Sequence, residues 1–242
     1  MNGDEKAPKH YPKGYTQVIL NRLWISFKHR KTCKVTMDTS AYQKLDANQA
    51  SKTLADFSGI LPGSPIDSQT VQIMAAPTSF YPDTKVYDIL DRGAHPPRGF
   101  TVVAKGKATT LVDYSVKTLQ EMNDNYALRL SDETVCDYLR FYFRYVQGSY
   151  GRFNLIESVE DIAWREEPPS TAKKALSDII ESLPQAMAYD EDEKIWFGKL
   201  SFIFQTSLFQ AIIIVAHTGE VTIRDQKLVI DQMPVAEDVV ET

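Results

Sequence analysis

Residues 208–215, with the sequence LFQAIIIV, constrain the fold more than any other stretch of this chain. The run is almost wholly apolar, which indicates a strand that is buried on both faces in the middle of a sheet. It does not fit a membrane-spanning helix, because such a helix needs about twenty consecutive apolar residues. The fold therefore has to place a neighbouring strand on each side of this segment.

The segments before and after this run predict an antiparallel meander. Residues 195–205 largely alternate apolar and polar side chains, as a strand with one buried face does. Residues 217–220 (HTGE) turn the chain into a strand at residues 221–223. Asp225 and Gln226 are expected to turn the chain once more before the apolar residues that follow.

Two other segments have the periodicity of helices that cover a core. In residues 131–147 the apolar side chains fall within one broad sector, and in residues 170–183 they form a single stripe. Together with the strands, these helices predict an α+β fold. Its antiparallel sheet contains a C-terminal three-strand meander, and the amphipathic helices pack on one face of that sheet.

Composition divides the chain into four predicted parts. Residues 1–14 are polar and predict a mobile N-terminal arm, and residues 15–60 predict a stretch of mixed helix and strand. The run GILPGSPIDS is rich in glycine and proline and marks a boundary before the main α+β domain at residues 66–234. Residues 235–242 form an acidic tail.

Aromatic residues and arginines alternate through residues 138–153, YLRFYFRYVQGSYGRF. Such a mixture marks either a surface on which nucleotide bases stack or one side of a core helix. On a helix the arginines face away from the aromatic sector, which favours the core helix. Tyr138 and Tyr145 lie one above the other beside Phe141, and their hydroxyl groups need partners if buried. We therefore predict that these three residues line an apolar ligand pocket beside the sheet.

The loop at residues 91–99, DRGAHPPRG, gathers groups that suit an enzyme for anionic substrates. His95 would be a general base near neutral pH, and Arg92 and Arg98 would grip an anion through paired N–H groups. In the alternative interpretation the prolines fix a connecting loop whose charged side chains face water. We favour the alternative, because the composition of a loop is a weak indication of catalysis.

Other sequence signatures of chemistry are missing. The four histidines are scattered, and no phosphate-binding glycine loop, nucleophile elbow or calcium loop occurs. Cys33 and Cys136 lie far apart in the sequence, so both are predicted to be free thiols, with no zinc site. We expect no metal and no cofactor, and we lean toward a protein that is not an enzyme.

The net charge of −5 is unevenly distributed. A basic segment at residues 28–34 would suit nucleic acid, yet blocks of like charge are more often simply solvated. The sequence shows no signal-peptide pattern, no membrane helix and no lipidation motif. These features predict a cytoplasmic protein without a membrane partner.

The favoured interpretation is a non-enzymatic binding or interaction module. Its partner would be another protein, or a small molecule in the apolar pocket beside the sheet, and the apolar sheet surfaces would also suit a homo-oligomer. An enzyme that acts on a small anionic substrate through residues 91–99 is the first alternative. Weak nucleic-acid binding through residues 28–34 is the second, and the usual solvation of such charge runs argues against it.

Overall fold

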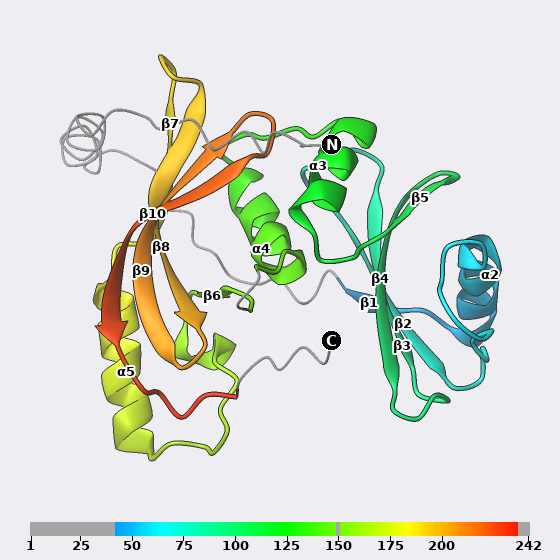
Figure 1. The fold of residues 1–242 in the computed structure, drawn as a ribbon, viewed down its shortest axis with the longest axis horizontal. Coiled ribbons are helices and arrows are strands. Elements are labelled where there is room, and N and C mark those ends of the chain that lie inside the picture. Colours follow the sequence, from blue (N-terminus) through cyan, green and yellow to red (C-terminus); the bar gives the residue numbers. More distant parts are fainter. Residues whose placement is uncertain (1–41, 149–150, 237–242) are drawn as a thin grey trace, which may run out of the picture. The chain divides into compact units, whose positions relative to one another are not determined.

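The computed structural model describes residues 42–148 and 151–236, all of which belong to one compact unit. These residues form two antiparallel sheets and four α-helices (Figure 1), which confirms the predicted α+β class. The predicted arm at residues 1–14, the basic segment at residues 28–34 and most of the acidic tail lie outside the described residues.

The first sheet takes its strands in sequence order: β1 (Gln43–Lys44), β2 (Val71–Pro77), β3 (Lys85–Asp91), β4 (Arg98–Lys105) and β5 (Ala108–Leu111). The second has the order β10-β9-β8-β6, and β7 also pairs with β8: β6 (Asn154–Ile156), β7 (Ala186–Asp190), β8 (Ile195–Phe204), β9 (Ser207–Ala216) and β10 (Val221–Ile230). The helices are α2 (Ala47–Phe57), α3 (Val116–Asn125), α4 (Val135–Tyr145), α5 (Ser170–Ser182) and the short 3₁₀ helix η3 (Val159–Asp161). None of these helices combines the length and the apolar character that crossing a bilayer requires.

The three C-terminal strands form the predicted meander, with β9 at its centre. β9 carries the apolar run of residues 208–215, most of which is buried. Neighbouring residues of a strand point to opposite faces of the sheet. Phe202 of β8 belongs to the apolar cluster that contains α4, whereas Ile203 belongs to the cluster that contains Leu176 of α5. The helices α4 and α5 therefore cover opposite faces of this sheet, whereas the sequence predicted helices on one face only.

The prediction of a second turn within the meander is wrong. Asp225 and Gln226 do not separate two strands, because β10 continues through them to Ile230. A β-bulge between Arg224 and Lys227 accommodates these two residues, and Asp225 has a φ of 47°. Aspartate tolerates this left-handed conformation better than most residues. Residue types that are typical of a turn here bend one strand without ending it.

The first half of the aromatic segment, residues 138–145, lies in a core helix, as its periodicity predicted. In α4, Tyr138 is completely buried, and Phe141 and Tyr145 are nearly so. All three belong to an apolar cluster that also includes Val103 of the first sheet and Leu200 of the second. Helix α4 therefore packs against both sheets, which accounts for its wide apolar sector.

Helix α4 is shorter at both ends than the predicted range of residues 131–147. Before it, the hydroxyl of Thr134 accepts a hydrogen bond from the N–H of Ser131 at 2.9 Å, which holds a turn in place of a helical start. After it, Val146 is extended, and the N–H of Gln147 donates to the carbonyl of Tyr114 at 2.9 Å. Hydrogen bonds outside the helical pattern thus set both ends.

A buried chain of hydrogen bonds joins α4 to three other parts of the fold. The Tyr138 hydroxyl donates to the carbonyl of Gly219, between β9 and β10, at 2.6 Å, and accepts from the side-chain amide of Asn123 in α3 at 3.0 Å. The same amide donates to the carbonyl of Thr218 and accepts from the hydroxyl of Tyr81, which precedes β3. Burial raises the pKa of Tyr138, so its hydroxyl stays protonated and able to donate. We name these residues the Asn123 network.

Tyr138→Phe should lower the free energy of unfolding by about 1–3 kcal/mol, because buried partners in the Asn123 network lose a hydrogen bond. Urea denaturation of the variant and the wild type measures this difference. Tyr142→Phe is the matched control: Tyr142 is also buried in α4, but its hydroxyl has no hydrogen-bond partner among the described residues. Equal losses in the two variants would contradict the role assigned to Tyr138.

Gly219 has no room for a side chain. Its φ is +83°, and a Cβ there would collide with the Asn123 amide and the Tyr138 hydroxyl. Gly106, between β4 and β5, also has a positive φ, of +59°, but a Cβ there would meet open space. Gly106→Ala should cost about 1 kcal/mol from backbone strain alone, whereas Gly219→Ala should cost about 2–4 kcal/mol because it also overpacks the network. Urea denaturation of both variants measures this, and similar losses would show that the close approach at Gly219 is unimportant.

Cys136 forms a disulfide bond, so the prediction that it is a free thiol is wrong. Distance along the sequence does not determine whether two cysteines approach each other in the fold. Cys33, to which the same prediction applied, lies outside the described residues.

Candidate functional site

A cavity of about 340 Å³ opens beside β6, at the edge of the second sheet. Arg140, Arg144 and Arg152 all line it, and we name it the arginine cavity. Its apolar wall includes Phe143 and Ile203. Cationic and apolar groups therefore line the same small volume.

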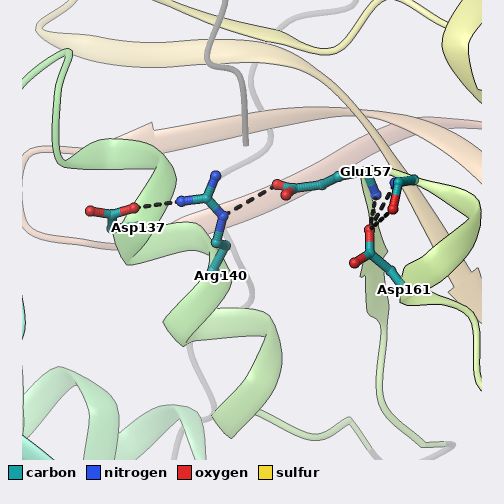
Figure 2. Close-up of polar contacts among 5 residues, drawn as sticks. Asp137, Arg140, Glu157 and Asp161 are labelled. Atoms are coloured by element: carbon teal, nitrogen blue, oxygen red, sulfur yellow. Dashed lines mark hydrogen bonds and ion pairs between the residues drawn. The ribbon is translucent and has the colours of Figure 1, made fainter. Parts of the chain in front are cut away.

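Arg140 lies between two acidic side chains at this cavity. Its Nη1 forms an ion pair with Asp137, one helical turn earlier in α4, and its Nε donates to Oε1 of Glu157 at 3.3 Å. Figure 2 shows the guanidinium group between the two carboxyl groups. The Asp137–Arg140 pair follows from the helical spacing of three residues, whereas the contact with Glu157 joins two segments that are distant in sequence. Only 14% of the Arg140 side chain is exposed.

The turn that carries Glu157 is held by the carboxylate of Asp161 in η3. Oδ2 of Asp161 accepts hydrogen bonds from the backbone N–H of Glu157 at 2.9 Å and of Ser158 at 2.8 Å. It also accepts from the Ser158 hydroxyl at 3.3 Å (Figure 2). This is a side-chain cap of the kind that fixes helix starts. It fixes the backbone from which the Glu157 side chain extends toward α4.

The protonation of Glu157 is shifted by its surroundings. Its side chain is only 11% exposed, and burial raises its pKa. Arg140 lowers the pKa, while the carboxylates of Asp161 and Asp137 raise it. Burial outweighs the nearby guanidinium, and the pKa of Glu157 rises to about 8. At pH 7 the Glu157 side chain is therefore mostly the neutral acid.

A second cavity, of about 260 Å³, lies over β2, β3 and β4 of the first sheet, and we name it the sheet cavity. Asp88 lines this cavity and accepts several hydrogen bonds: Oδ1 accepts from the hydroxyls of Thr101 and Tyr145, both at 2.9 Å, and Oδ2 pairs with Arg144 at 3.0 Å. Burial and the charge of Asp88 raise the pKa of Tyr145. Arg144 and Arg152 line both cavities.

The prediction that Tyr138, Phe141 and Tyr145 line one pocket stays a prediction, although the three residues belong to one apolar cluster. Tyr145 lines the sheet cavity. Tyr138 lines neither cavity, and its hydroxyl is used within the Asn123 network. Phe141 also lines neither cavity, and its ring packs against the rings of Phe80 and Tyr145, at 5.2 and 4.8 Å between centroids.

The predicted catalytic loop at residues 91–99 is the tip of the β3–β4 hairpin. Arg98 pairs with Asp91 at 2.6 Å, and this hydrogen bond lowers the pKa of Asp91. Arg92 donates to a side chain of β2 at 3.0 Å, and His95 is exposed. Neither the arginine cavity nor the sheet cavity includes His95, Arg92 or Arg98, so the three do not gather around either one.

Within residues 42–148 and 151–236, no three histidine, cysteine, aspartate or glutamate side chains are arranged to hold a metal ion. No family model, no curated protein and no solved structure matches the chain.

Sequence reasoning did not single out Glu157 or Asp88. Glu157 stands among acidic residues that follow no defined spacing, and Asp88 stands in a short strand-like run. Their partners lie 17 residues away for Arg140 and 57 residues away for Tyr145. The one signal in the sequence was the polar side of the aromatic helix, where Arg140 and Arg144 face away from the core.

Glu157→Gln should change how stability depends on pH, because Gln imitates the neutral acid and does not titrate. The folded-state pKa of about 8 lies above the ordinary value of 4.5, so the folded wild type binds the extra proton between these pH values. The contribution of Glu157 to the free energy of unfolding is therefore largest below pH 4.5, and it is lost as the pH rises to about 8. Relative to Glu157→Gln, the wild type should lose about 2–4 kcal/mol of stability between pH 5 and pH 9, after allowance for solvent screening of this partly solvated group.

Urea denaturation of both proteins at several pH values gives this difference. Glu160→Gln is the matched control, because Glu160 is an exposed acid of the neighbouring η3 helix and does not line the arginine cavity. If the free energies of unfolding of the wild type and Glu157→Gln changed equally from pH 5 to pH 9, the pKa of Glu157 would not be raised.

Proposed function

We propose that the chain is a binding module that takes up a small organic acid in the arginine cavity. The anionic group of the ligand lies at the guanidinium groups, and its apolar part lies against the wall that includes Phe143 and Ile203. Binding alone is proposed, without a chemical reaction.

The size and lining of the arginine cavity support this proposal. Ligand sites in proteins are typically cavities of roughly 300–1,000 Å³ with apolar walls and a few convergent polar groups. The arginine cavity, at about 340 Å³, falls at the lower end of that range. A ligand of the size of a small aromatic or branched carboxylic acid suits this volume.

The free donors of Arg140 are the observation that carries the proposal. A guanidinium group has five N–H donors. Arg140 uses Nη1 for Asp137 and Nε for Glu157, and its Nη2 has no partner among the described residues. A mostly buried guanidinium with unused donors at a cavity favours an anion, because charge-assisted hydrogen bonds are strong where water is scarce.

The balance of charge at the arginine cavity also favours an anion. Of its two acidic lining residues, Glu157 is mostly neutral at pH 7, and Asp161 is engaged as the cap of its own turn. Arginine remains charged at any pH that proteins experience. Within the lining, positive charge therefore exceeds negative charge, although Asp137 and Asp88 pair with Arg140 and Arg144 from outside it.

Titration calorimetry with benzoate, acetate and inorganic phosphate tests the proposal on the full chain at pH 7. Benzoate should bind with a dissociation constant on the order of 1 mM, and acetate more weakly, because acetate lacks an apolar body to bury. Arg144→Gln should weaken benzoate binding by about tenfold, as expected for the loss of one charged hydrogen-bond donor. Lys117→Gln is the control: it removes the same charge from an exposed position of α3 that lines neither cavity.

Amide chemical shifts distinguish the two cavities, since Arg144 lines both. Benzoate should shift the amides of residues 154–157, at the arginine cavity, more than those of residues 99–101, at the sheet cavity. The proposal would be overturned if none of the three anions bound at a concentration tenfold above the dissociation constant expected for benzoate. Equal affinity of the wild type and Arg144→Gln for benzoate would also overturn it.

A further inference from the structure

We infer that the arginine cavity binds its organic acid together with one proton, which the ligand carboxylate shares with Glu157. This inference rests on the proposed function and adds a chemical condition to it: the ligand is a carboxylate or another anion that accepts a hydrogen bond from a carboxylic acid. Glu157 is then a donor to the ligand, and its protonation controls affinity.

The position of Glu157 supports this role. Its side chain lines the arginine cavity, and Oε1 is engaged with Nε of Arg140. Oε2 has no hydrogen-bond partner among the described residues. Oε2 and the unused Nη2 donors of Arg140 belong to neighbouring groups at one cavity, so one bound carboxylate can contact both.

The charged groups around Glu157 are consistent with a neutral acid at this position. From α4 it faces Arg140 and Asp137, and from η3 it faces Asp161. Arg144 and Arg152 line the same cavity. Asp137 already pairs with Arg140, and Asp161 already accepts the hydrogen bonds of the turn, so neither is available to replace Glu157 as a donor.

Two carboxyl groups in hydrogen-bond contact do not both ionise, because the second negative charge lies too close to the first. The two carboxyl groups therefore share a single proton, and the Glu157 O–H donates a hydrogen bond to the carboxylate of the ligand. No covalent bond forms or breaks. Below the pKa of Glu157 the proton is already present, and above it the complex must take one proton from the solvent.

This linkage fixes the pH dependence of binding. Benzoate, whose carboxyl group ionises with a pKa of roughly 4, stays anionic across the neutral and alkaline range. Its affinity for the wild type should be constant from pH 6 to 7. Above pH 8 it should fall by up to about tenfold for each pH unit, as expected for uptake of one proton.

Titration calorimetry with benzoate at pH 6, 7, 8.5 and 9.5 measures this dependence. Wild type should bind at least tenfold more weakly at pH 9.5 than at pH 7. Glu157→Gln should bind with nearly equal affinity, within about twofold, at all four values, because the Gln amide donates a hydrogen bond at every pH. Glu160→Gln, which changes an exposed acid on the adjacent η3, should retain the pH dependence of the wild type.

A second readout counts the proton directly. At pH 8.5 the observed binding enthalpy should differ between phosphate-free buffers of low and high ionisation enthalpy for the wild type, and should not differ for Glu157→Gln. Affinity that is independent of pH in the wild type, or an equal pH dependence in Glu157→Gln, would overturn this inference and leave the proposed function standing. Failure of benzoate to bind at any pH would overturn both.

Discussion

The hydroxyl group of Tyr138 fixes the position of α4, and the arginine cavity depends on that position. It exchanges hydrogen bonds with Asn123 and Gly219 in the interior of the fold, where an unmatched polar group is costly. Because these partners come from α3 and from the connection between β9 and β10, only one placement of α4 satisfies them together. A fully satisfied polar network of this kind selects a single arrangement among the many that apolar packing alone would allow.

The same helix then carries the cationic side chains of both cavities. Arg140 follows Tyr138 by two residues, which places it on the other side of α4, toward β6 and η3. Arg144, one turn later, points to Asp88 of the first sheet. One helix therefore contributes its aromatic side to the core and its polar side to two sites. The helical spacing of α4 alone links the buried Tyr138 to the arginines that line the two cavities.

The sequence pattern predicted correctly those elements whose structure depends mainly on neighbouring residues in the chain. The apolar run around Ile213 gave the central strand, and the separation of arginines from aromatics on α4 indicated a core helix. The bulge at Asp225 was not predictable, since its residue types are those of a turn and pairing with β9 decides the outcome. Glu157 was missed for a similar reason: its shifted pKa comes from burial against α4 and η3, which the sequence does not express. Tyr145 was singled out as a pocket residue, but its partner Asp88 was not, because the two are far apart in sequence.

Arg144 lies above the rings of Tyr42 and Tyr145, each 5.5 Å from its guanidinium carbon, while Asp88 holds the end of its side chain. A long side chain restrained in this way has already lost most of its rotamer freedom when the protein is folded. Arg144 therefore loses little further conformational entropy when it binds an anion. The entropy cost that usually opposes binding to an arginine side chain is correspondingly small. The two tyrosine rings and Asp88 thus make the guanidinium a rigid part of the cavity wall, although 41% of the side chain is open to solvent.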